Sequence, residues 1–109
     1  MSAKDIFHDT ARTALEKNGW IITKDPLFLN LTKQFKINID LGCEKLLAAE
    51  NATQKIAVEV KSFVGRSAVS EFHMAVGQFL NHRLALELLA SERVLYLAVP
   101  ADRSRFLYR

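Results

Sequence analysis

The sequence predicts a mixed α/β domain, in which helices cover the faces of a mixed sheet. Three observations predict this class. Residues 35–40 alternate strictly between apolar and polar side chains, and residues 55–63 alternate again, as strands do. The opening segment and a long segment ending near Ala90 repeat apolar positions at helical spacing. The strand, helix, strand passage at residues 55–99 is a crossover unit, which makes the sheet mixed.

A first helix is expected in the opening segment. Ser2 is a candidate N-cap with Asp5 three residues further on, and Asn18-Gly19 is a typical helix end. The apolar positions between them fall on one stripe: Ile6, Phe7, Ala11, Ala14 and Leu15.

The strands before the second helix are predicted as follows. Residues 20–23 are aromatic and β-branched and form a first strand, which the turn at Asp25-Pro26 closes. Residues 27–31 fit either a short strand or a loop. Residues 35–40 form a half-buried strand, whose expected core face is Phe35, Ile37 and Ile39.

Residues 46–50 fit either a continued strand or a helical turn, and the polar residues 51–54 are expected to form a hairpin loop. The strand at residues 55–63 presents two faces. One carries Ile56, Val58 and Val60, and the other carries Ala57, Glu59 and Lys61.

Residues 65–67 are expected to form a loop and a helix cap. The long helix that follows has a predicted apolar stripe of Val69, Phe72, Val76, Phe79 and Leu80. Residues 93–99 are apolar on both faces and end at Pro100, which suits a central strand covered on both sides.

Composition excludes several classes of protein. Half of the 109 residues are hydrophobic, which is too many for a disordered chain, and no run approaches the about 18 apolar residues of a membrane span. Residues 1–6 lack an apolar signal-peptide core, and the single cysteine, Cys43, suits a reducing compartment. We therefore expect one cytoplasmic domain over residues 1–109, with no membrane partner.

The net charge of +3 does not predict a strong nucleic-acid surface. Residues 1–101 hold 12 Lys or Arg against 11 Asp or Glu, so much of the excess lies in residues 102–109. Because phosphate affinity scales with clustered cations, this distribution predicts at most weak, salt-sensitive attraction to DNA.

Three polar residues are candidates for chemistry: Asp40, at the end of its predicted strand, and Glu59 and Lys61 on one face of the next. If the two strands are neighbours, Asp40 faces Glu59, and adjacent carboxylates repel unless a cation lies between them. Mg²⁺ prefers such oxygen ligands, and Lys61 would orient a water or a phosphoryl oxygen.

Less specific interpretations remain open. The same three residues also suit an ordinary solvated strand face, because short motifs match by chance. Gln78 lies on the same helix face as Glu71 and His82 and fits a solvated side. His8, His73 and His82 are expected at the surface or its boundary, and Cys43 is expected to be a small packing residue.

The pattern of polar residues resembles that of the PD-(D/E)XK nuclease superfamily. It consists of Asp40 on a strand, Glu59-Val60-Lys61 on the next strand and Gln78 on the following helix. More narrowly, several blocks in register resemble the cyanobacterial XisH family: residues 4–8 (KDIFH), 19–26 (GWIITKDP), 39–42 (IDLG), 55–63 (KIAVEVKSF), 77–78 (GQ) and 93–100 (RVLYLAVP).

This resemblance implies a restriction-endonuclease-like core of helix, three strands, helix and strand. It also implies a role in excision of the fdxN element, a programmed DNA rearrangement, with a XisI-like partner. Asp40 and Glu59 would be ligands of Mg²⁺ or Mn²⁺, Lys61 the catalytic lysine and Gln78 the residue that orients phosphate or lysine. Family members usually continue beyond the position of Pro100, so the C-terminal end is expected to be short.

Two functions of different class follow. The first is Mg²⁺-dependent hydrolysis of DNA phosphodiester bonds. The second is a non-cleaving interaction module for a XisI-like protein or a site-specific recombinase, which the near-neutral charge favours. A homodimer that covers the sheet edge is a further expectation.

Overall fold

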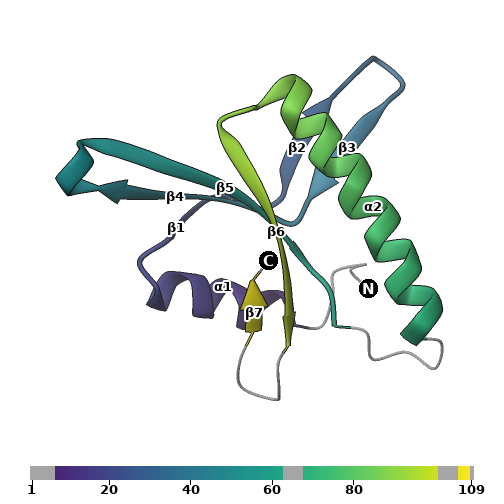
Figure 1. The fold of residues 1–109 in the computed structure, drawn as a ribbon, viewed down its shortest axis with the longest axis horizontal. Coiled ribbons are helices and arrows are strands. Elements are labelled where there is room, and N and C mark those ends of the chain that lie inside the picture. Colours follow the sequence, from purple (N-terminus) through teal and green to yellow (C-terminus); the bar gives the residue numbers. More distant parts are fainter. Residues whose placement is uncertain (1–6, 63–67, 101–105, 109) are drawn as a thin grey trace.

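The computed structural model of the chain describes residues 7–62, 68–100 and 106–108. Within these ranges a five-stranded sheet has the order β1-β4-β5-β6-β7, and β2 and β3 form a separate two-stranded sheet (Figure 1). The elements in chain order are α1 (His8–Lys17), β1 (Ile21–Lys24), β2 (Leu27–Asn30), β3 (Lys36–Ile39), β4 (Leu41–Leu47), the 3₁₀ turn η1 (Ala48–Glu50), β5 (Ala52–Val60), α2 (Ala68–Leu89), β6 (Arg93–Pro100) and β7 (Phe106–Tyr108).

The large sheet is mixed, as predicted. Strand β4 pairs antiparallel with both β1 and β5, whereas β5 and β6 are parallel and are joined through α2. The core has the predicted order of helix, three strands, helix and strand. These elements are α1, then β1, β4 and β5, then α2 and β6. The β2–β3 hairpin is inserted between the first two of those strands, and β7 pairs with the outer edge of β6.

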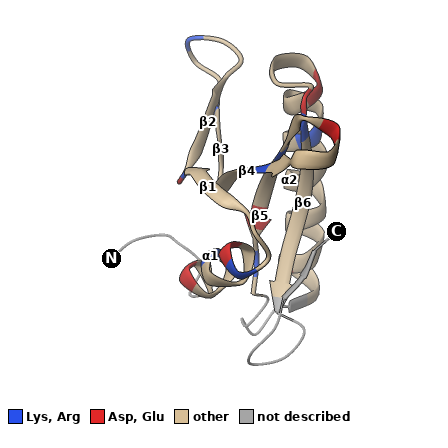
Figure 2. Ribbon diagram, turned by 90° about the vertical axis from the view of Figure 1, so that its left-hand side faces the viewer, with Lys and Arg blue, Asp and Glu red and all other residues tan. Residues whose placement is uncertain are grey.

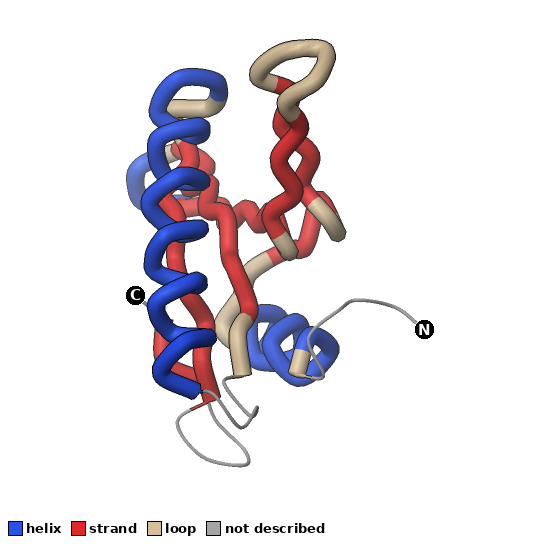
Figure 3. The backbone as a smooth tube through the Cα atoms, turned by 90° about the vertical axis from the view of Figure 1, so that its right-hand side faces the viewer, coloured by secondary structure: helices blue, strands red, loops and turns tan. Residues whose placement is uncertain are grey.

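The two helices lie on opposite sides of the sheet (Figure 3). Ala11 and Leu15 of α1 are buried against one face, as their spacing predicted. The residues they meet there come from three strands: Leu41, Cys43, Ile56, Val58, Val60 and Ala98. The predicted cap at Ser2 lies outside the described residues, and the helix ends at Asn18 and Gly19 as expected. Gly19 has a positive φ of 89°, a conformation that favours glycine.

Residues 27–31, which fitted a strand or a loop, contain strand β2. Its partner β3 begins at Lys36, one residue later than predicted, and Ile37 and Ile39 are buried. The prediction for Phe35 was wrong, because its side chain is 64% exposed. Phe35 belongs to the hairpin turn. Its backbone carbonyl accepts a hydrogen bond from the Leu31 N–H, and its own N–H donates to Thr32. Phe35 therefore does not share the core face of β3.

Strand β4 is one that the sequence did not predict as such. Residues 46–50 combine both predicted alternatives, because the strand runs to Leu47 and the 3₁₀ turn follows. The hairpin loop predicted at residues 51–54 was wrong for 52–54, since β5 begins at Ala52, which pairs with Leu47. Asn51 makes the turn at a φ of 49°, a left-handed conformation that asparagine tolerates.

Strand β5 is central and buried on both faces. Ile56, Val58 and Val60 face α1, as their alternation predicted, whereas Ala57 packs on the α2 side. On β6, Leu95 and Ala98 are buried, but Val94 is 55% exposed. The helix α1 has ten residues and spans about 15 Å, which is less than the length of the eight-residue strand β6. It therefore cannot cover the whole of one face of β6, and Val94 stays exposed.

The apolar stripe predicted for α2 was largely wrong. Val69, Phe72, Val76 and Leu80 are exposed, and only Phe79 packs against the core. Ala75, Ala85 and Leu86 are the buried positions instead. The helix is apolar almost all round, so spacing alone fits several faces, and the small Ala75 and Ala85 allow close approach to the sheet. The loop and cap predicted at residues 65–67 lie outside the described residues.

Neither helix, over the residues that the structure describes, is long and apolar enough to cross a membrane. Figure 2 shows basic and acidic positions side by side on α1. In the sequence these are Asp9, Arg12, Glu16 and Lys17. This mixture agrees with the near-neutral charge of residues 1–101.

Candidate functional site

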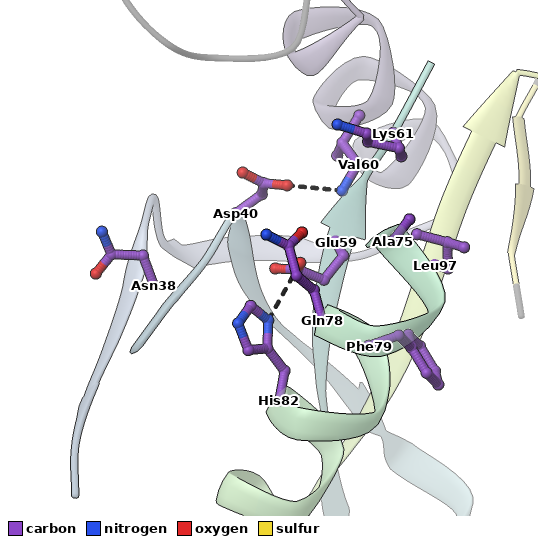
Figure 4. Close-up of a pocket in the computed structure, with 10 residues that line it drawn as sticks. All are labelled: Asn38, Asp40, Glu59, Val60, Lys61, Ala75, Gln78, Phe79, His82 and Leu97. Atoms are coloured by element: carbon purple, nitrogen blue, oxygen red, sulfur yellow. Dashed lines mark hydrogen bonds and ion pairs between the residues drawn. The ribbon is translucent and has the colours of Figure 1, made fainter. Parts of the chain in front are cut away.

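A pocket of about 320 Å³ lies where the end of β5, the start of β4 and the inner side of α2 meet (Figure 4). All four residues singled out in the sequence line it: Asp40, Glu59, Lys61 and Gln78. The other lining residues are Asn38, Val60, Ala75, Phe79, His82 and Leu97. The fold therefore brings the four predicted side chains together from positions up to 38 apart in the chain.

Asp40 lies at the junction between β3 and β4. The expectation that its strand would neighbour the strand of Glu59 needs correction, because β3 pairs with β2. It is β4, which begins directly after Asp40, that pairs with β5. Leu41 stands opposite Val58, so the register continues to Asp40 and Glu59. The Val60 backbone N–H donates a 2.7 Å hydrogen bond to Asp40 Oδ2, which fixes the carboxylate at the strand end.

Glu59 is the last residue but one of β5. Its side chain faces α2, because its neighbours Val58 and Val60 face α1. Its Oε2 lies 3.2 Å from His82 Nδ1 on α2, and the two side chains are 15% and 16% exposed. The contact is an ion pair by distance only. It lacks hydrogen-bond alignment, and His82 Nδ1 is buried with no hydrogen-bond partner among the described residues.

Lys61 lies directly after the last residue of β5. Its backbone N–H donates to the Ala98 carbonyl at 3.0 Å, so the chain still follows β6 at this point. Gln78 is exposed on α2, one helical turn before His82. In Figure 4 the Lys61 side chain lies at one end of the pocket and His82 at the other. The roles assigned to these residues from the sequence stay predictions.

Sequence reasoning missed two residues of the pocket, His82 and Asn38. The shared helix face of Gln78 and His82 was noticed, but it was interpreted as a solvated side. The available signal was the spacing of Gln78 and His82, which are four positions apart and therefore neighbours on one side of the helix. No sequence pattern marks Asn38, whose position depends on the hairpin.

The other histidines have different environments. His73 is exposed, as expected. The surface prediction was wrong for His8, whose side chain is 4% exposed and whose Nε2 lies 2.9 Å from Asp25 Oδ1. Arg12 Nη1 donates to the other oxygen of Asp25 at 2.6 Å, so this cluster ties α1 to the turn after β1. It lies apart from the pocket residues and acts in the fold.

Cys43 packs in the core, as expected. It is fully buried, and burial raises the pKa of its thiol from 9.0 to about 11, against a smaller lowering by Arg93 and Arg12. The thiol therefore stays protonated at neutral pH and is no nucleophile there.

The donor set of the pocket fits a hard divalent cation. Magnesium is typically held by one or two carboxylates together with water and substrate phosphate, and Asp40 and Glu59 supply such a pair. Over the described ranges no group of three His, Cys, Asp or Glu side chains is placed to hold a metal ion. A cage made entirely of such protein ligands is therefore not what this part of the chain provides.

The sequence was compared with known proteins. Residues 1–108 match the XisH protein family. A crystal structure of an XisH family protein from Nostoc punctiforme PCC 73102 is 50% identical, with a TM-score of 0.73, over 89% of this chain and 70% of that one. The structure of an fdxN element excision controlling factor protein from Anabaena variabilis is 48% identical, with the same TM-score and the same coverage of both chains. No curated protein matches the sequence. The family match over almost the whole chain shows that this protein belongs to the XisH family.

Proposed function

We propose that the protein acts in the controlled excision of a DNA element and that its pocket hydrolyses DNA phosphodiester bonds with Mg²⁺ or Mn²⁺. The excision role rests on the Anabaena relative, which is described as an fdxN element excision controlling factor. One observation carries the hydrolytic role: Asp40, Glu59, Lys61 and Gln78 line the same pocket.

Each residue has a chemical task in this proposal. Asp40 and Glu59 would hold the cation, which when bound would supply activation of a water and neutralisation of the phosphate charge. Lys61 donates to the non-bridging phosphoryl oxygen that becomes more negative in the transition state. Gln78 offers both an amide donor and an amide acceptor at the open side of the pocket, where it orients the phosphate or Lys61.

The charge distribution argues that DNA is presented to this site by a partner. Residues 1–101 carry almost no net charge, so few counterions would be released on binding a duplex. A XisI-like protein or a site-specific recombinase would supply the missing affinity and direct the chain to the element ends.

The test is a cleavage assay on supercoiled plasmid DNA with Mg²⁺ or Mn²⁺, with and without a co-expressed XisI-like protein. Wild type should nick or linearise the plasmid, and chelation of the metal should stop this. Asp40→Asn and Lys61→Ala should each reduce the rate by at least about 100-fold, as loss of an electrostatic stabiliser does.

Matched controls separate chemistry from folding. Lys55→Ala changes a lysine of β5 outside the pocket, and Asp9→Ala removes an exposed carboxylate of α1. Both controls should cleave at the wild-type rate. Cleavage that survives in both pocket variants would contradict the hydrolytic role.

A second candidate function is a non-cleaving interaction module, and the outer surface of α2 favours it. Val69, Leu84 and Leu88 on this helix are 57–71% exposed. Apolar side chains gathered on one element are typical of a protein-binding surface. This function predicts a stable complex with a XisI-like protein, which Leu84→Lys should weaken while Lys55→Ala leaves it intact. Failure to co-purify with the XisI-like protein or the recombinase would count against it.

A further inference from the structure

We infer that His82 is a positioning residue for Glu59, and that its Nδ1 holds one carboxylate oxygen so that the other is presented to the cation. The inference rests on the proposed role of Glu59 as a metal ligand. It assigns a task to a residue of α2 that the sequence suggested was solvated.

The placement of His82 on α2 is the first observation. The side of α2 that faces the sheet is otherwise apolar at this level, with Phe79, Ala85 and Leu86 beside His82. An imidazole that is 16% exposed in such surroundings loses hydration. A buried Nδ1 without a partner is costly, so the ring needs a compensating group, and Glu59 Oε2 at 3.2 Å is the group within reach.

The second observation is that each carboxylate has a protein nitrogen beside one of its oxygens. Asp40 Oδ2 accepts from the Val60 N–H, and Glu59 Oε2 lies against the nitrogen of His82. The Asp40 contact is a hydrogen bond, and the Glu59 contact is close by distance. Such outer contacts orient ligand oxygens before the ion arrives, and their loss typically lowers metal affinity 10–100-fold.

His82 fits this supporting task better than direct ligation. Mg²⁺ prefers oxygen ligands, and within the described residues Asp40, Glu59 and His82 do not form a three-residue metal group. The present contact also lacks hydrogen-bond alignment, which a small rotation of the ring or the carboxylate would supply when the ion binds.

The test uses the whole chain and Mn²⁺ alone, with metal affinity measured by titration calorimetry. His82→Ala should weaken Mn²⁺ binding 10–100-fold. His82→Asn keeps an N–H near the position of Nδ1 and should restore affinity to within a few-fold of wild type. His82→Gln places its N–H near the position of Nε2 instead and should behave like His82→Ala. His73→Ala, a change at an exposed histidine of the same helix, should have no effect.

A second readout needs no metal. In ¹⁵N-labelled, metal-free protein, His82 Nδ1 should carry the proton, and Glu59→Gln should shift its resonance while leaving that of His73 in place. A proton on Nε2 alone, or a resonance insensitive to Glu59→Gln, would overturn the inference even if one variant failed to fold.

The outcomes separate this inference from the proposed function. Metal affinity that follows the Ala, Asn and Gln series in a protein that cleaves no DNA would support the positioning role and contradict hydrolysis. Cleavage-competent protein whose Mn²⁺ affinity is the same in all three His82 variants would contradict the positioning role alone.

Discussion

The backbone N–H of Val60 and the side chain of Asp40 are joined by a 2.7 Å hydrogen bond, which ties the end of β5 to the junction before β4. Because the acceptor is a carboxylate and Val60 is buried, Asp40→Ala would leave an unpaired donor in the interior. We expect this change to lower the free energy of unfolding by about 1–3 kcal/mol.

Urea denaturation measures the effect. Asp40→Asn keeps an acceptor oxygen and should cost clearly less than Asp40→Ala, although both remove a charge from the pocket. Equal losses in the two variants would show that the charge of Asp40, not its bond to Val60, matters for the fold.

The glycines of β4 and α2 should respond to alanine in opposite directions. A Cβ at Gly42 would lie 3.0 Å from Lys24 Cβ and 3.2 Å from Arg93 Nη1, which is too close for a strand held on both sides. Gly42→Ala should therefore destabilise the protein by about 1–3 kcal/mol.

A Cβ at Gly77 would meet nothing within 4 Å, and the residue lies inside a helix. Gly77→Ala should therefore stabilise the protein by up to about 1 kcal/mol. Thermal unfolding followed by circular dichroism should give a lower Tm for the first variant and a higher Tm for the second, and a rise in both would refute the packing around Gly42.

Two leucines of α2 distinguish its buried side from its outer side. Leu86 is 1% exposed and Leu80 is 48% exposed. Leu86→Ala should cost about 2–5 kcal/mol, because it removes packed atoms and leaves a cavity. Leu80→Ala should change the stability by no more than about 0.5 kcal/mol. Chemical denaturation of both variants checks this, and the reverse order would support the stripe that spacing alone predicted.

The stability should fall at alkaline pH because of Cys43. Its pKa is raised by burial to about 11 in the folded protein, from 9.0 when exposed, so the unfolded chain loses this proton first. The contribution of Cys43 to stability is then constant below about pH 9 and declines by about 1.4 kcal/mol per pH unit up to about pH 11.

Urea denaturation of wild type and Cys43→Ala at several pH values isolates this contribution, since other groups titrate equally in both. The difference between the two proteins should shrink as the pH rises from 9 to 11. A constant difference would mean that the thiol ionises equally in both states.

The strands with alternating sequence and the crossover were predictable, because periodicity of two and a following helical segment leave few topologies. Ile56, Val58 and Val60 illustrate this, since all three share one face of β5 as predicted, and that face packs on α1. The same periodicity missed β4, whose Gly42, Glu44 and Lys45 weaken its strand signal although every residue pairs with β5.

Side-chain environments that depend on tertiary packing were harder to predict. Phe35 matched the core face of β3 in the sequence, yet it belongs to a turn and is exposed. On α2 the buried side was ambiguous because apolar residues surround the helix. His82 lies at the boundary, as predicted, but its contact with Glu59 could not be predicted because it depends on how α2 docks on the sheet.

The crossover from β5 through α2 to β6 also has a consequence for the order of folding. Asp40 and Glu59 belong to one local β4–β5 hairpin, whereas Gln78 and His82 join them only after α2 has docked on the sheet. The hairpin can pair stepwise from its turn through short loops, whereas α2 joins the sheet only through contacts across the crossover. We therefore expect the two carboxylates to meet while the helix side of the pocket is still missing, so that a cation present during folding encounters half a site first.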